Sequence, residues 1–228
     1  MRPPRTEVEL IQRADALAGR RVGRIARQAG TTCPPDLRRH KGFIGELLER
    51  ALGATAGARS EPDFPHLGVE LKTIPVDAAG RPRQSTWVCT APVFTLDPGP
   101  WSTSLLRRRL ARVLWIPIVG DGPPAERGVG VPILWSPDPD EEQVLAQDWG
   151  QLTQLIADGE VWQWSAHHGE ALQLRPKAAS SSDRVEITDA DGDLVETVPL
   201  GFYLRRGFTA GILAREPSLV PASLQQTR

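Results

Sequence analysis

The segment from Val69 to Ile74 sets the strongest limit on how this chain folds. Its β-branched and aliphatic residues alternate with polar ones, which is the pattern of a half-buried β-strand. Side chains leave a strand on alternate faces, so Glu70 and Lys72 share one face and the apolar residues beside them share the other. Asp63 comes shortly before, so two carboxylates and one ammonium can meet at one end of this strand.

Such a set of side chains suits the hydrolysis of phosphodiester bonds. Two carboxylates can hold a hard divalent cation such as Mg²⁺, which keeps several water ligands and binds a substrate phosphate. The cation acidifies a bound water, and a neighbouring lysine can orient that water or stabilise charge in the transition state. The alternative is a surface Glu–Lys pair whose Asp caps a turn. These residues alone leave both interpretations open.

The charge distribution is compatible with nucleic-acid binding, although the chain is not basic as a whole. The formal net charge is -1 over 228 residues, but phosphate contacts require local Lys and Arg clusters rather than a basic average. Such clusters occur at residues 38–41, 107–112 and 205–206, while acidic residues concentrate at 138–142 and 183–196. Clusters of this size are also common on solvated faces, so they do not decide the matter.

Helical periodicity dominates the first fifty or so residues. A capping-box pattern begins a first helix at Thr6, and a second short helix follows. A pair of prolines then predicts a longer helix over residues 35–52, with one broad apolar face. Glu46 and Glu49 flank that face by similar angles, so periodicity does not show which of them reaches a site.

The rest of the chain alternates strands and helices without an internal repeat, which predicts a mixed α/β fold. Strands are expected over residues 85–95, 113–119, 131–135 and 169–177, a hairpin over 185–198, and helices from Ser102 or Thr103 through Arg112, over 139–157 and over 208–214. Residues 1–215 are expected to form a single domain of two closely packed lobes. Residues 216–228 are expected to be a weakly ordered tail.

Several functional classes lack support in the sequence. It has no apolar run of the roughly 18 residues that a membrane span needs, and its first residues show no apolar signal region, so a cytoplasmic protein is expected. Cys33 and Cys89 are too few for a disulfide framework or a four-thiolate zinc site. No Gly-rich nucleotide-phosphate loop occurs, so any ATP dependence would belong to a partner.

Motifs along most of the chain resemble the MutH family of mismatch-repair endonucleases. The first runs from Lys41 to Glu49, and the strand segment matches from Leu67 to Asp77. Further matches are Gly80-Arg-Pro82, Trp87-Val-Cys-x-Ala-Pro92, Arg112-Val-Leu-Trp-Ile-Pro117, Leu134-Trp-Ser-Pro137, Leu174-Arg-Pro-Lys-Ala-Ala179 and Gly201-Phe-Tyr-Leu204. They fall in family order. The resemblance implies a restriction endonuclease-like α/β fold, with a mixed β-sheet flanked by helices and two lobes forming a DNA-binding cleft.

The resemblance also implies a function. Members of this family are methyl-directed mismatch repair endonucleases that use Mg²⁺ to nick the unmethylated strand of hemimethylated GATC sites, 5′ to the G. Intrinsic nicking would be weak and raised by a MutL-type ATPase, acting with a MutS-type mismatch sensor. No docking motif for either partner is visible in the sequence, and a monomer is expected.

Roles at the metal site carry over from the family residue by residue. Asp63 and Glu70 would be Mg²⁺ ligands, with Glu49 as a third acid at the metal. The resemblance thereby selects Glu49 where periodicity could not. Lys72 would act on the nucleophilic water or on the phosphate.

Roles at the DNA interface follow in the same way. The implied contact residues are Lys41, Arg108, Arg109, Arg175, Lys177 and Tyr203. The adenine methyl group projects into the major groove, where a close side chain can reject it, and Tyr203 is the candidate sensor. Arg109 stands where family members can carry lysine, so only a phosphate contact is expected of it.

The tryptophans are expected in the core or at lobe contacts rather than on a base-stacking surface.

Two alternative functions remain at this stage. A GATC-specific restriction-type endonuclease would share the fold and motifs but cut both strands. A non-catalytic module that only senses methylation is the other alternative. The carboxylates speak against it, because they repel phosphate unless a metal is present.

Overall fold

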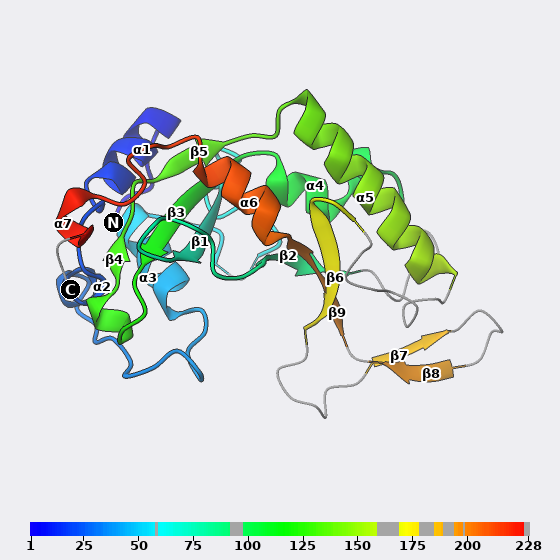
Figure 1. Cartoon of the computed structure of the whole chain (residues 1–228), viewed down its shortest axis with the longest axis horizontal. Helices are drawn as coiled ribbons and strands as arrows, with labels where there is room; N and C mark the ends of the chain where they lie inside the picture. The colour runs from blue at the N-terminus through cyan, green and yellow to red at the C-terminus, as the bar shows by residue number, and fades with distance from the viewer. Residues whose placement is uncertain are drawn as a thin grey trace. The chain divides into compact units, whose positions relative to one another are not determined.

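The computed structural model describes residues 1–57, 59–91, 98–158, 169–177, 185–188, 194–197 and 199–225. Within them the chain has the predicted mixed α/β composition and divides into two compact units (Figure 1). The first unit comprises Met1–Gln84, Arg112–Ser136 and Ala210–Arg228, and the second comprises Ser85–Ala111 and Pro137–Thr209. No helix in the described part of the chain is both long and apolar enough to cross a bilayer.

The sheet of the first unit is built around two parallel strands. β1 (Glu70–Val76) pairs in parallel with β3 (Val113–Val119), and β4 (Gly128–Val129) and β5 (Ile133–Trp135) pair antiparallel with β3. Figure 1 shows β3 between β4 and β1. Every residue of β3 is buried, as expected for a central strand that is covered on both faces.

Three helices cover one face of this sheet. Side chains of α1 (Glu7–Asp15), α2 (Val22–Gln28) and α3 (Phe43–Leu52) form one buried apolar cluster together with Leu71 of β1 and Leu114 of β3. These two leucines are aligned in the parallel register, so they share a face. Alternation along the strand therefore places Glu70 and Lys72 on the opposite face.

The start of α3 differs from the sequence prediction. The helix begins at Phe43 rather than near residue 35, and the segment before it forms turns. The carboxylate of Asp36 accepts a hydrogen bond from the backbone N–H of Arg38 at 2.8 Å, and such local bonds compete with helix formation. The prediction for α1 is confirmed, since the Thr6 hydroxyl accepts from the N–H of Glu9 at 3.1 Å.

The second unit has its own antiparallel sheet. β2 (Thr86–Thr90), β9 (Leu200–Leu204) and β6 (Leu172–Pro176) pair in the order β2-β9-β6, and β7 (Val185–Thr188) with β8 (Leu194–Thr197) forms the predicted hairpin. One face of the three-stranded sheet carries Phe202, which packs on Trp149 of α5 (Pro139–Ala157) with ring centroids 5.2 Å apart.

The helices of the second unit agree with the sequence to different degrees. α5 has the predicted bounds and begins with a capping box between Asp138 and Glu141. α4 (Leu105–Leu110) is shorter than predicted, because a short 3-10 helix, η1 (Trp101–Thr103), precedes it and Ser104 caps it. The boundary between the units falls within α6 (Arg206–Leu213), which starts two residues earlier than predicted.

The C-terminal segment packs against the first unit where it is described. It contains α7 (Ala222–Gln225), and both Leu219 and Leu224 are buried. The carbonyl of Leu219 accepts from the N–H of Val131 at 2.9 Å. A Cβ on Gly130 would lie 2.8 Å from the same carbonyl oxygen, so glycine there permits the close approach.

A second 3-10 helix, η2 (Pro124–Glu126), lies before β4.

Candidate active site

Asp63 is held beside β1 by a tight turn. Phe64 and Val69 exchange two backbone hydrogen bonds of 2.9 and 3.3 Å, and Gly68 within the turn adopts a φ of 67° that favours glycine. The Asp63 carboxylate accepts from the N–H of Leu71 at 2.8 Å. The turn therefore carries Asp63 back to the first residues of β1, as the sequence predicted.

Glu70 and Lys72 are buried rather than lying on a half-exposed face. Their relative exposures are 4% and 7%, and Lys72 Nζ donates to Glu70 Oε1 at 3.2 Å. The sequence alternative of a solvated surface pair is thus wrong. Burying a charged pair is costly unless hydrogen bonds and neighbouring charges compensate, so this pair is unusual for a purely structural element.

Glu49 joins this group from the C-terminal half of α3. Burial of its side chain, together with the nearby negative charges of Asp63, Glu46 and Glu70, raises the pKa of Glu49 to about 7, while Lys72 acts in the opposite direction. Glu46 is exposed. Of the two acids that periodicity could not separate, Glu49 is the half-buried one, and it interacts with Asp63, Glu70 and Lys72.

The composition of this acidic group suits a divalent cation. Three carboxylates accompany a single ammonium. Burial and then the negative charges of Asp63, Glu46 and Glu70 raise the pKa of Glu49, and a cation would relieve the repulsion among these charges. Carboxylate oxygens are the ligands that Mg²⁺ prefers. Among the described residues no three His, Cys, Asp or Glu side chains are already arranged to enclose a metal. Because Lys72 Nζ donates a hydrogen bond to Glu70, a metal would compete with Lys72 for the Glu70 carboxylate.

A bidentate ion pair supports the start of β1. Arg112 Nε and Nη2 donate to the two carboxylate oxygens of Glu7 at 2.9 and 2.6 Å, which lowers the pKa of Glu7. The carbonyl of Arg112 accepts from the N–H of Glu70 at 2.9 Å. The backbone of Glu70 is thus hydrogen-bonded to the residue that immediately precedes β3.

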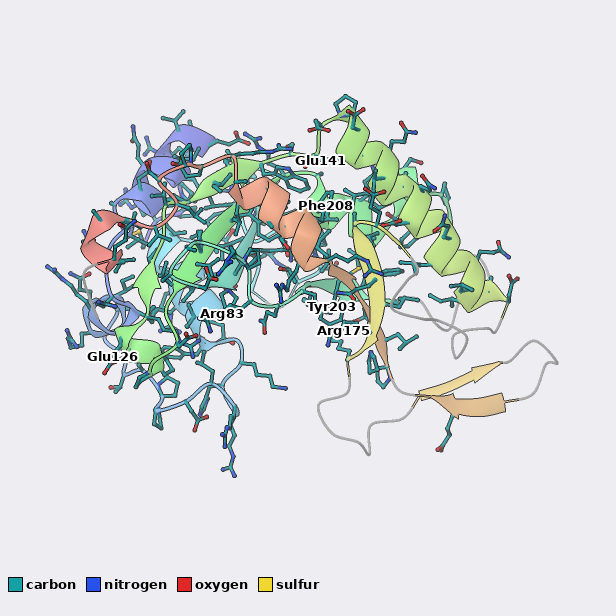
Figure 2. All side chains as sticks on the ribbon, in the orientation of Figure 1. Arg83, Glu126, Glu141, Arg175, Tyr203 and Phe208 are labelled. Carbon is teal, nitrogen blue, oxygen red and sulfur yellow. The ribbon has the colours of Figure 1, made fainter. Side chains whose placement is uncertain are left out.

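The open face of the second unit's sheet brings together two residues predicted at the DNA interface. The guanidinium of Arg175 lies 5.5 Å from the ring centroid of Tyr203, and Arg175 Nη1 donates to Ser85 Oγ at 2.6 Å. Figure 2 shows Arg175 and Tyr203 near one another on the neighbouring strands β6 and β9. Arg175 is exposed and Tyr203 is half-buried.

Lys177 makes a similar pair on the same sheet with Trp87 of β2. Its Nζ lies 4.7 Å from the centroid of the Trp87 ring and donates to Thr90 Oγ1 at 3.0 Å. Trp87 is 41% exposed and lies opposite Tyr203 in the register. Trp87 is therefore not a core residue, unlike what was expected of most tryptophans. Its place in a short alternating strand was the available signal, but the face it occupies depends on a β-bulge beside it.

The remaining predicted contact residues lie on two other elements. Lys41 is exposed immediately before Gly42, the N-cap of α3. Arg108 is exposed and Arg109 is half-buried on α4. Their neighbour Arg107 donates to Glu142 at 2.6 Å, so the arginine cluster includes a structural ion pair as well.

Comparison with known proteins supplies the family. The family model for the DNA mismatch repair enzyme MutH matches residues 52–148. The chain is 51% identical over 213 residues to the DNA mismatch repair protein MutH of Shewanella baltica strain OS185, which covers 92% of this chain and 96% of that protein. It is 50% identical over 218 residues to the MutH of Vibrio cholerae, covering 94% and 99% respectively.

Identity at this level over nearly the whole of both chains is decisive for membership. The matched region of the family model includes β1 with Asp63, Glu70 and Lys72. This chain therefore belongs to the MutH family of DNA mismatch repair enzymes.

Proposed function

We propose that this chain is a Mg²⁺-dependent endonuclease that nicks the unmethylated strand of hemimethylated GATC sites, 5′ to the G, during mismatch repair. The observation that carries this proposal is the buried Glu70–Lys72 pair with Asp63 and Glu49 beside it. Buried, mutually repelling carboxylates are disfavoured in a purely structural role and favoured where a cation and a phosphate must meet.

Each residue of this group has a definite task in the proposed reaction. Asp63, Glu70 and Glu49 would hold Mg²⁺, which supplies an acidified water and neutralises charge on the phosphate when bound. The N–H of Leu71 keeps the Asp63 carboxylate oriented. Lys72, which donates a hydrogen bond to Glu70, would orient the attacking water or donate to a phosphate oxygen.

The basic and aromatic face of the β2-β9-β6 sheet is the proposed DNA-reading surface. Arg175 and Lys177 present exposed cations beside the rings of Tyr203 and Trp87. Arginine can make bidentate bonds to a guanine edge, and a tyrosine close to adenine can reject its methyl group. We assign discrimination of methylation to Tyr203 and phosphate contacts to Lys41, Arg108 and Arg109.

Regulation by a MutL-type ATPase, with a MutS-type sensor upstream, is part of the same proposal and is supported by family membership alone. The same holds for a monomeric, cytoplasmic protein and for a DNA cleft between two lobes. The restriction-type alternative predicts double-strand cuts, and the methylation-sensing module predicts binding without turnover.

The proposal is tested by nicking of supercoiled plasmid that carries GATC sites, in Mg²⁺ and with the MutL-type partner. Wild type is expected to nick, whereas Glu70→Gln and Lys72→Met lose at least about 100-fold, because each removes a group acting on the reacting phosphate. Glu46→Gln, the exposed acid one helical turn before Glu49, is the matched control and should retain wild-type activity.

A second readout separates metal binding from turnover. Mg²⁺ binds the folded chain only, so it should raise the unfolding temperature of wild type more than that of Glu70→Gln. Folded wild type that binds GATC DNA but never nicks it with partner and Mg²⁺ present would contradict the enzyme assignment.

A further inference from the structure

A short basic segment before α3 is not used by the catalytic group. Residues 38–41 read Arg-Arg-His-Lys, and all four side chains are exposed. In the part of the chain that the structure describes, none of these four side chains makes a hydrogen bond or an ion pair. The nearest acid in sequence, Asp36, uses its carboxylate to bond the backbone of Arg38 instead.

The segment is nevertheless anchored. Leu37 on one side and Phe43 on the other are partly buried against the apolar cluster of the first unit. Two backbone bonds fold the segment between them, from His40 N–H to the Leu37 carbonyl at 3.3 Å and from Phe43 N–H to the His40 carbonyl at 3.0 Å. The four basic side chains therefore project from a defined pair of turns.

Some arginines of the same unit are paired with an acid within it. Arg13 pairs with Glu9 at 2.5 Å and Arg112 with Glu7 at 2.6 Å. Adjacent like charges without an acidic partner repel one another and favour the binding of an anion. A DNA strand supplies a row of such anions, one phosphate for about every 3.4 Å of helix axis.

The position of the segment fits the proposed reaction. It ends at the first turn of α3, and Glu49 lies seven residues after the N-cap Gly42 on the same helix. At about 1.5 Å per residue, Glu49 lies about 10 Å along the helix axis from Gly42.

We propose that Arg38 and Arg39, together with Lys41, form a phosphate-binding arm that grips the DNA backbone near the cleaved bond. The arm acts on any sequence and any methylation state, because it contacts only phosphates. This inference rests on the proposed endonuclease function, and it adds Arg38 and Arg39 as residues that bind the DNA phosphates.

The test measures how DNA affinity depends on salt. The full chain is titrated, without divalent metal, into a labelled duplex with one GATC site and into a duplex without one, at several NaCl concentrations. Arg38→Gln and Arg39→Gln should each reduce the slope of log K against log salt by about 0.9, and the double variant by about 1.8. Affinity for the two duplexes should fall by the same factor, so the preference for GATC stays constant.

Arg24→Gln is the matched control, since Arg24 is an exposed arginine on α2 of the same unit. It should keep the wild-type slope, and all variants should keep the wild-type unfolding temperature. The arm is overturned if the folded double variant retains the wild-type slope, or if it loses affinity only for the GATC duplex. A wild type that nicks GATC while the double variant keeps its slope refutes the arm alone. A wild type that binds neither duplex refutes the arm and the proposed function together.

Discussion

At the scale of single residues, the acidic group combines features that the sequence could and could not predict. The alternation around Glu70 and Lys72 predicted that both side chains share a face. Their burial was not predictable, because it depends on chain that covers both faces of β1. Glu49 could not be separated from Glu46 by helical periodicity, since the difference between them lies in packing against other elements.

The raised pKa of Glu49 gives a prediction for stability. Folded Glu49 binds its proton more tightly than the unfolded chain does, so wild type loses stability as pH rises from about 4.5 to about 7. Glu49→Gln does not lose stability over this pH range in the same way, because glutamine does not titrate. Measured by urea unfolding in a metal chelator, the variant should gain about 1 to 2 kcal/mol on wild type between pH 5 and pH 8, after allowance for solvent screening.

Glu46→Gln provides the comparison on the same helix. Glu46 is exposed, but its charge contributes to the raised pKa of Glu49, so Glu46→Gln should move the pH dependence of unfolding only part of the way from wild type towards Glu49→Gln. Parallel pH profiles for wild type and Glu49→Gln would show that burial and the neighbouring carboxylates do not raise the pKa of Glu49 as described.

At the scale of elements, the sequence predictions agree best with the structure where the sequence signal lies within the element itself. α5 was predicted to the residue, because its capping box and amphipathic pattern lie within the helix itself. α3 was not, because Asp36 bonds the backbone of Arg38 and directs the chain into turns. The place of Trp87 depends on pairing between β2 and β9, which are more than 100 residues apart, and such pairing leaves little trace in a single sequence.

Asp148 of α5 organises the entry to β6. Its carboxylate, only 3% exposed, accepts hydrogen bonds from the backbone N–H groups of Glu170, Ala171 and Leu172 at 2.7 to 3.0 Å. Asp148→Ala leaves these donors unpaired, so it should destabilise the protein by about 3 to 5 kcal/mol in urea unfolding. The exposed neighbour Gln147 provides the control, and Gln147→Ala should cost less than about 0.5 kcal/mol.

The same interaction connects to DNA recognition, because β6 carries Arg175 and leads to Lys177. Asp148→Asn keeps one acceptor oxygen and should be milder than the alanine variant. A stability for Asp148→Ala equal to that of Gln147→Ala would show that the carboxylate does not hold the strand.

At the scale of the whole molecule, neither unit is a continuous stretch of chain. The first unit takes segments from the start, middle and end of the sequence, and its C-terminal part packs Leu219 and Leu224 into buried positions. A tail with few apolar residues looks weakly ordered in sequence, because its partners, such as Val131, lie far away along the chain. Resemblance to the MutH family grouped Glu49 with Asp63, Glu70 and Lys72, and the charges of these four residues interact in the structure. Their roles stay predictions.

The most direct test of the central claim is strand-resolved cleavage of a short duplex with one hemimethylated GATC site and a different label on each strand. In Mg²⁺ with the MutL-type partner, we predict a single product from the unmethylated strand, ending 5′ to the G, and an intact methylated strand. Duplex methylated on both strands should remain uncut. Cleavage of both strands of the hemimethylated duplex, or equal cleavage of the fully methylated one, would contradict the account.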